Sequence, residues 1–406
     1  MAMPEEFSTE AVQAASADAF EPYQHFLSSG EPYRSMISSN PWMRPPRAKD
    51  PLEWGQGWYY DTTVGRKHPD WKDVALPRAT KDLRQLRQDL YTWGYCLIED
   101  GLSAAQCARI HARVVDQAAA ERALGIAHVS PEQQHVWSLV NKGPDFPRLL
   151  EHDPECVQAG PMIETLLDET LGAGWNHYSF LANISYPDCH PQGLHQDQSA
   201  IAPFRSLEAP VLVNTVYILQ DVNEHNGGTL IIPGSHRVQA EGAIYGALPR
   251  AINLEAPAGS VLIMDGRTLH GGAVNRSGAL RYILTNSVVK PWLKQQESFL
   301  LGLSPAVLAA ASDKFLWRCG FQATSVRNMV EGYGYFGSGQ VADPNGSLVH
   351  VRRAMDAGGY VHTGSLSMDN LEAVDLAALG LPRIQAAHET YRSENYQTRM
   401  AAVASR

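Results

Sequence analysis

The stretch GLHQDQS at 193–199 places an imidazole and a carboxylate two residues apart, with amide side chains beside them. In an extended strand, residues i and i+2 point to the same face, so His195 and Asp197 would project together while Gln196 points away. Two such groups on one side favour a metal site, although a His-x-Asp pair alone is common in proteins that bind no metal. A third ligand is needed to make this interpretation specific.

His270 and Arg281 complete the pattern. His270 follows a strand-like run that ends at Asp265, and Arg281 opens the next strand eleven residues later. Antiparallel strands can bring both beside His195 and Asp197. Two histidines and one carboxylate on one octahedral face leave the opposite face open, as in non-haem Fe(II) oxygenases. The positive charge left on the iron would attract a 2-oxo acid, whose far carboxylate suits the planar guanidinium of Arg281.

These residues, with NEHNGGTLIIPGSHR at 223–237, resemble the phytanoyl-CoA dioxygenase family over roughly residues 80 to 295. Members of that family are Fe(II)- and 2-oxoglutarate-dependent oxygenases with a double-stranded β-helix core. The resemblance implies specific roles: catalytic iron ligands His195, Asp197 and His270, a 2-oxoglutarate clamp Arg281, and cofactor or substrate contacts Gln192 and Thr229.

The reaction implied by the resemblance couples O2 and 2-oxoglutarate to the oxidation of a small organic molecule, with release of succinate and CO2. Hydroxylation is the expected outcome, and desaturation, epoxidation or rearrangement are its variants. No cluster of Lys and Arg stands out that would hold the phosphates of coenzyme A. We therefore favour a free natural-product intermediate as substrate, with an acyl-CoA hydroxylase of the same family as the alternative.

Four further residues are candidate substrate contacts, each with a structural alternative. Asn183 lies on the strand before the metal motif and could face the site or solvent. Asn141 and Lys142 could reach a substrate or cofactor carboxylate, although an exposed lysine is the commoner case. Trp292 could line the rim of a pocket, or it could pack in the core.

Three other functions compete with this interpretation. A non-catalytic metal-binding jelly roll would not need the complete set of ligands and clamp. A zinc hydrolase with two histidines, one aspartate and a water would not explain Arg281, and no convincing general-base glutamate lies beside the ligands. A halogenase needs a halide at the position that Asp197 fills.

The composition limits the partners and the compartment. The chain has 406 residues, of which 44% are hydrophobic, and a formal net charge of −10 without a clustered basic run. This balance argues against nucleic acid or an anionic membrane as partner. Five widely spaced cysteines indicate reduced thiols. No signal peptide and no apolar run of membrane-spanning length are visible, so we expect a cytoplasmic protein.

The order of the elements predicts a mainly β fold with flanking α-helices: a double-stranded β-helix (jelly-roll, cupin-like) core with N- and C-terminal extensions. Asn226-Gly227 predicts a type I′ hairpin turn. Helices are expected from Thr80 to Gly94, from Ser103 to about Gly125 and over 161–171, and strands over 95–98, 178–186, 211–219, 229–232, 260–264 and 281–289.

Three regions follow from this pattern. Residues 1–79 form an irregular extension rich in Pro, Trp and Tyr, which would wrap a domain, cover the site or pair with a second copy in a homodimer. We expect residues 80–295 to form the dioxygenase jelly-roll core with its N-terminal helices, and residues 296–406 to form a helical extension packed on that core.

Overall fold

The computed structural model describes residues 71–129, 132–187, 189, 192, 194–201, 209–237 and 251–321. Within these ranges the chain divides into two compact units. The first unit holds residues 71–290 with 295–297, and the second holds 291–294 with 298–321. Most of the predicted extensions, residues 1–70 and 322–406, lie outside the described residues.

Two helices of the first unit, α4 and α5, begin at capping signals in the sequence. Helix α4 starts after Asp82, whose carboxylate accepts a hydrogen bond from Arg84 N at 2.9 Å, and so begins three residues later than Thr80 suggests. Ser103 and Gln106 form the predicted capping box of α5. The helices are α4 Leu83–Trp93, α5 Ala104–Ala123, α6 Asp145–Leu150 and α7 Gly160–Leu171, with the 3₁₀ turns η4 Leu139–Asn141, η5 Asp197–Ala200 and η7 Ser235–Arg237.

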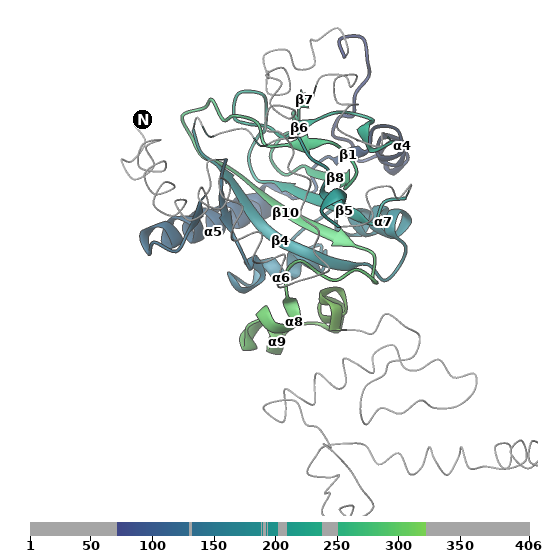
Figure 1. Ribbon diagram of the computed structural model, residues 1–406. Coiled ribbons are helices and arrows are strands. Elements are labelled where there is room, and N and C mark those ends of the chain that lie inside the picture. The colour runs from purple at the N-terminus through teal and green to yellow at the C-terminus, as the bar shows by residue number, and fades with distance from the viewer. Residues whose placement is uncertain are drawn as a thin grey trace, which may run out of the picture. The chain divides into compact units, whose positions relative to one another are not determined.

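The strands form two antiparallel sheets, the jelly-roll architecture that the sequence predicts. The order is β1-β8-β5-β10-β4-β3-β2 in the seven-stranded sheet and β7-β6-β9 in the three-stranded sheet. Figure 1 shows the long strands β4 and β10 side by side. The strands are β1 Tyr95–Ile98, β2 His128–Val129, β3 Gln134–Val136, β4 Asn176–Ser185, β5 Leu212–Ile218, β6 Leu230–Ile231, β7 Ile252–Asn253, β8 Val261–Asp265, β9 His270–Gly271 and β10 Arg281–Val289.

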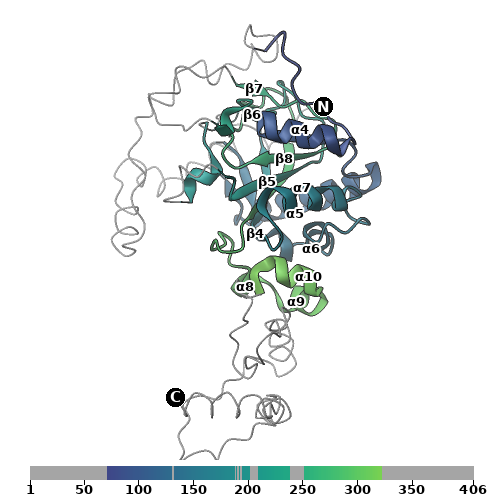
Figure 2. The same cartoon turned by 90° about the vertical axis from the view of Figure 1, so that its right-hand side faces the viewer.

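Helices cover one face of the large sheet. Helix α4 contacts β1 and β8, α5 contacts β10, and α7 contacts β5. Figure 2 shows these three helices lying across the strands. The opposite face of the sheet is therefore left to meet the small sheet and to enclose a site.

A hydrophobic core fills the space between the two sheets. Leu262 and Val216 of the large sheet pack in one cluster with Ile231 and Ile252 of the small sheet. Trp71 and Leu76 belong to the same cluster and are 6% and 7% exposed. The last residues of the predicted N-terminal extension therefore pack against the barrel.

The loop between β5 and β6 differs from the prediction. A type I′ turn needs positive φ at both central residues, but only Gly227 has it, with φ of 77°. The side chain of Asn226 instead accepts a hydrogen bond from Asn223 N and donates one to Asp221 O, which stabilises a wider loop. The local Asn-Gly signal was outweighed by these side-chain hydrogen bonds to the backbone.

The second unit contains short helices only: α8 Phe299–Gly302, α9 Pro305–Ala310 and α10 Asp313–Leu316, followed by a single turn, η9 Trp317–Phe321. Ser304 and Ser312 accept hydrogen bonds from Val307 N and Phe315 N at the starts of α9 and α10. No helix in the described part of the chain is long and apolar enough to cross a membrane. All five cysteines are buried and free, as predicted.

Candidate metal centre

The two histidines meet through a backbone bridge. His195 N donates to His270 O at 2.9 Å, and His270 N donates to His195 O at 3.0 Å. Such a hydrogen-bonded antiparallel pair places both side chains on one face of the sheet. The two imidazole centroids accordingly lie 4.5 Å apart. The segment that carries His195 and Asp197 thus meets β9 through a single bridge.

Asp197 joins the histidines because Gln196 keeps an extended backbone, with φ −114° and ψ 120°, before η5 begins. Its Oδ1 lies 3.3 Å from His195 Nε2, and its Oδ2 lies 3.4 Å from His270 Nε2. Metal bonds of about 2.1 Å would place adjacent ligand atoms about 3 Å apart. Two histidines and a carboxylate at this spacing fit Fe(II), and they are the one cluster of potential metal ligands among the described residues.

Neighbouring groups orient these ligands. Thr268 O accepts a hydrogen bond from His270 Nδ1 at 3.0 Å, which leaves Nε2 of the same ring for a metal. Asn214 of β5 donates to Asp197 Oδ2 at 2.6 Å, and Ser287 of β10 donates to Asn214 Oδ1 at 2.7 Å. Burial alone would raise the pKa of Asp197, but the charge and hydrogen bonds of His270 and His195 hold that pKa well below its ordinary value.

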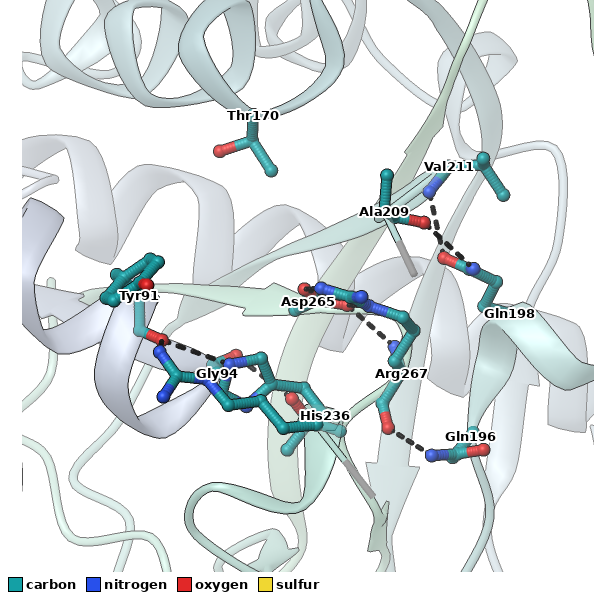
Figure 3. A network of polar contacts seen from close by, with 12 residues as sticks. Tyr91, Gly94, Thr170, Gln196, Gln198, Ala209, Val211, His236, Asp265 and Arg267 are labelled. Carbon is teal, nitrogen blue, oxygen red and sulfur yellow. Dashed lines mark hydrogen bonds and ion pairs between the residues drawn. The ribbon is translucent and has the colours of Figure 1, made fainter. Parts of the chain in front are cut away.

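The flanking amides fix the segment that carries His195 and Asp197. Figure 3 shows Gln196 donating through Nε2 to Arg267 O. Gln198 N donates to Gly266 O at 2.9 Å, and Gln198 Oε1 accepts from Val211 N at 2.8 Å (Figure 3 shows the latter bond). These contacts explain why glutamines flank Asp197: their side chains hold the backbone while the ligands face the site.

An ion pair stabilises the turn that receives these amides. Arg267 Nη2 lies 2.6 Å from Asp265 Oδ2, with both side chains largely buried. In the same network (Figure 3), His236 Nε2 donates to Tyr91 O at 3.1 Å. His236 therefore fixes a turn against α4 and is not part of the metal cluster.

Arg281, at the start of β10, is a buried cation that is only partly hydrogen-bonded. The residue is 2% exposed, and its Nη2 donates to Gly227 O at 2.9 Å. Its Nε and Nη1 are buried without a hydrogen-bond partner among the described residues. Burial lowers the pKa of Arg281 to about 10. Two unused donors on a buried cation suit an incoming carboxylate.

Gly227 contributes to this geometry through its backbone. A Cβ there would approach Ala273 O at 3.0 Å, and its positive φ disfavours other residues. The glycine therefore lets its carbonyl reach Arg281.

A cavity of about 240 Å³ joins the metal cluster and Arg281. Gln192, Thr229 and Asn183 also line it. Gln192 Oε1 accepts from Gly272 N at 2.9 Å, so this side chain braces the residue that follows β9. Asn183 donates to Thr285 Oγ1 at 2.9 Å. The cavity thus lies between the inner face of the large sheet and the end of the small sheet that carries His270.

Comparison with known families agrees with this site. The model of the phytanoyl-CoA dioxygenase (PhyH) family matches residues 90–283, from within α4 to the first residues of β10. This part of the chain is a PhyH domain. The match contains all three clustered ligands and Arg281. By family and by site the PhyH domain is 2-oxoglutarate-oxygenase-like and falls in the oxidoreductase class.

Curated relatives and solved structures show only distant or partial similarity to this chain. An uncharacterized protein of Mycobacterium bovis is 27% identical over 265 residues, which cover 62% of this chain and 91% of that protein. Dioxygenase aneA of Aspergillus aculeatus is 38% identical over 107 residues, 25% of this chain and 36% of that protein. The carbocyclase SnoK from nogalamycin biosynthesis, a non-heme alpha ketoglutarate dependent enzyme, is 19% identical, with a TM-score of 0.44 over 57% of this chain and 94% of its own.

Three of the predicted substrate contacts do not line the cavity of the PhyH domain. Lys142 Nζ lies 3.3 Å from Glu121 Oε1 of α5, the helix on the outer face of the sheet. Asn141 precedes it in η4 and likewise does not line the cavity. Trp292 belongs to the second unit and is 52% exposed. The sequence pattern could not show that η4 turns toward α5.

The PhyH domain also brings residues to the cavity that the sequence analysis missed, including His135, Trp137, Tyr178 and Asn214. Gln133, His135 and Trp137 alternate along the chain, which is the signal of one strand face. That signal was available in the sequence. The sequence did not show that β3 pairs with β4, and this pairing is what brings the face of β3 to the site.

Proposed function

We propose that this chain is an Fe(II)- and 2-oxoglutarate-dependent oxygenase that oxidises an organic small molecule, a natural-product intermediate, and releases succinate and CO2. One observation carries the proposal. A His-Asp-His cluster and a buried arginine with two unused donors line the same cavity. The match to a dioxygenase family supports the same reaction class.

In this proposal His195, Asp197 and His270 hold the iron on one face. When bound, the iron supplies the activation of O2 that is coupled to decarboxylation of 2-oxoglutarate. One carboxylate against a divalent ion leaves a net positive charge, which attracts the dianionic 2-oxoglutarate. Asn214 keeps Asp197 oriented through its hydrogen bond of 2.6 Å.

Arg281 binds the distal carboxylate of 2-oxoglutarate. Its unused donors and its burial support this role, because a charge-assisted pair is strongest where water is excluded. Gln192 and Thr229 are the proposed neighbours of the cofactor. Since Gly272 N uses the side-chain oxygen of Gln192, the amide nitrogen is the group left to donate.

The competing functions are supported less well. A zinc hydrolase needs a general base beside its water, and no carboxylate other than Asp197 lines the described cavity. A halogenase needs a free coordination position where Asp197 projects between the two imidazoles. An acyl-CoA hydroxylase needs cations for phosphates, and Arg281 is the one Lys or Arg among the described lining residues.

Anaerobic Fe(II) titration of the full chain tests the proposal. We expect about one Fe(II) per chain and a visible charge-transfer band when 2-oxoglutarate is added. His270→Ala should lose both, while His225→Ala, an exposed histidine outside the cavity, should keep both. Full iron binding by His270→Ala would remove the assignment of the metal site. If iron binds but no band appears when 2-oxoglutarate is added, the assignment of 2-oxoglutarate as the co-substrate is wrong.

A further inference from the structure

We propose that the substrate is an uncharged molecule with a flat ring, which stacks on an aromatic wall formed by His135 and Trp137 at the mouth of the cavity. This inference rests on the proposed function, because it names the substrate class of the same site. Neither residue belongs to the metal cluster. Together they would select what reaches the iron.

The sheet register explains how the aromatic wall reaches the site. His135 of β3 pairs with Asn183 of β4, which pairs with Ile283 of β10. All three side chains line the cavity. Trp137, two residues after His135, lines it too, as alternation on one strand face requires. The aromatic wall therefore extends the inner face of the large sheet past β10 and β4 onto β3 and the residue that follows it.

The geometry of the wall suits a planar ligand. The rings of His135 and Trp137 are stacked, with centroids 4.9 Å apart and planes 24° apart. The ring of His128 meets Trp137 edge-on at 5.4 Å and supports it from another side. Trp137 nevertheless remains 43% exposed. The neighbouring rings hold the indole of Trp137 in place, and part of its surface stays exposed at the cavity. Another flat ring can therefore stack on it.

The charge of the described lining residues disfavours ionic substrates. Apart from Asp197 and Arg281, which the iron and 2-oxoglutarate would neutralise, no Asp, Glu, Lys or Arg is among the described residues that line the cavity. Burial, and in smaller part the neighbouring His128, lower the pKa of His135 to about 4, so its ring is neutral at physiological pH. A charged substrate group would lose its hydration there without gaining a partner.

The cavity volume places the ring at the mouth. About 240 Å³ is less than the roughly 300–1,000 Å³ of ordinary small-molecule pockets. This space takes 2-oxoglutarate and the reacting end of a substrate only. The rest of a larger molecule must lie outward, where Trp137 is exposed.

The test uses the full chain, loaded anaerobically with Fe(II) and 2-oxoglutarate, in equilibrium dialysis at neutral pH. The probes are 2-naphthol, which is flat and uncharged, 2-naphthoate, which adds a carboxylate, and decahydro-2-naphthol, which has no flat face. We expect 2-naphthol to bind at least tenfold more tightly than either of the others. Equal binding of 2-naphthoate or decahydro-2-naphthol, or no saturable binding of 2-naphthol, would overturn the inference.

Variants assign the preference to the aromatic wall. Trp137→Ala should weaken 2-naphthol binding at least fivefold, while Trp137→Phe, which keeps a ring, should stay within about twofold to threefold of wild type. Tyr91→Ala serves as control, because Tyr91 is 72% exposed but does not line the cavity. Unchanged binding by Trp137→Ala, or an equal loss in Tyr91→Ala, contradicts the proposal.

The charge-transfer band in the same samples separates the two proposals. If wild type shows the band but does not prefer 2-naphthol over the other two probes, the aromatic-wall proposal is wrong and the proposed function stands. Absence of the band in wild type refutes the proposed function, on which the wall depends. A folded Trp137→Ala variant must keep the band for its lost affinity to count.

Discussion

Replacing Arg281 by Met should separate stability from cofactor binding. Arg281 is 2% exposed, has no carboxylate partner among the described residues, and leaves two donors unused. Burial lowers its pKa from the ordinary value of an arginine, by more than two units, to about 10. At about 1.4 kcal/mol per pKa unit, keeping this cation buried without a carboxylate partner costs the fold about 3 kcal/mol.

The sign of the effect follows from the direction of the shift. A base whose pKa is lowered by folding destabilises the fold at every pH below its folded value, here about 10, and the penalty fades only as the pH rises toward the ordinary pKa of an arginine. At pH 7 the whole penalty is present. Methionine keeps an unbranched apolar stem without the charge, so the apo variant should be as stable as wild type or more stable, by up to about 3 kcal/mol.

Cofactor binding should change in the opposite direction. Wild type with iron and 2-oxoglutarate at about 100 times its dissociation constant should gain about 2.7 kcal/mol of stability. Loss of the buried charge pair weakens binding by about 2–5 kcal/mol, so the variant should gain less than about 1 kcal/mol at the same concentration. Thermal and denaturant unfolding at pH 7, with and without 2-oxoglutarate, measure both effects.

Arg267→Met is the matched control, because Arg267 is also largely buried but is paired with Asp265. Breaking that pair should destabilise the fold by about 3–5 kcal/mol, since it leaves Asp265 buried and unpaired. If Arg281→Met loses as much stability as Arg267→Met, Arg281 is a structural cation and the reasoning is wrong. A variant that keeps the 2-oxoglutarate-dependent stabilisation would show that another residue binds the distal carboxylate.

Three further changes test two residues of the ligand-bearing segment and one buried carboxyl group outside the described cavity lining. Gln196→Ala should raise the Fe(II) dissociation constant about 10- to 100-fold in anaerobic titration, because it frees the ligand-bearing segment from Arg267 O; an unchanged constant would exclude this positioning role. Asp197→Gly should abolish iron binding and succinate release, and recovery of succinate with excess chloride would show that a halide can take its place. Burial raises the pKa of Glu297 to about 7 from 4.5, so ionisation destabilises the fold as pH rises through this window. Glu297→Gln and wild type should therefore have similar unfolding free energies near pH 4 and differ by up to about 3 kcal/mol at pH 8, with the variant more stable; a constant difference at all pH values would contradict this.

Local sequence predicted most of the elements and the three residues that cluster in the candidate metal centre. The capping box of Ser103 and Gln106 starts α5 as predicted, and Gly94 ends α4 with a left-handed φ of 80°. These signals are readable because their hydrogen bonds join residues three or four positions apart. The spacing of His195, Asp197, His270 and Arg281 was likewise visible, since these residue types suit one kind of chemistry.

Tertiary structure alone decided which other residues share the site. His195 meets His270 through a bridge between distant segments, and Asn214 and Ser287 support Asp197 from two different strands. Lys142 turns to Glu121, while His135 faces the cavity. Alternation along a strand tells which side chains share a face, but it does not tell which strands become neighbours. That choice depends on long-range pairing and on the packing of the two sheets, and neither leaves a periodic trace in the sequence.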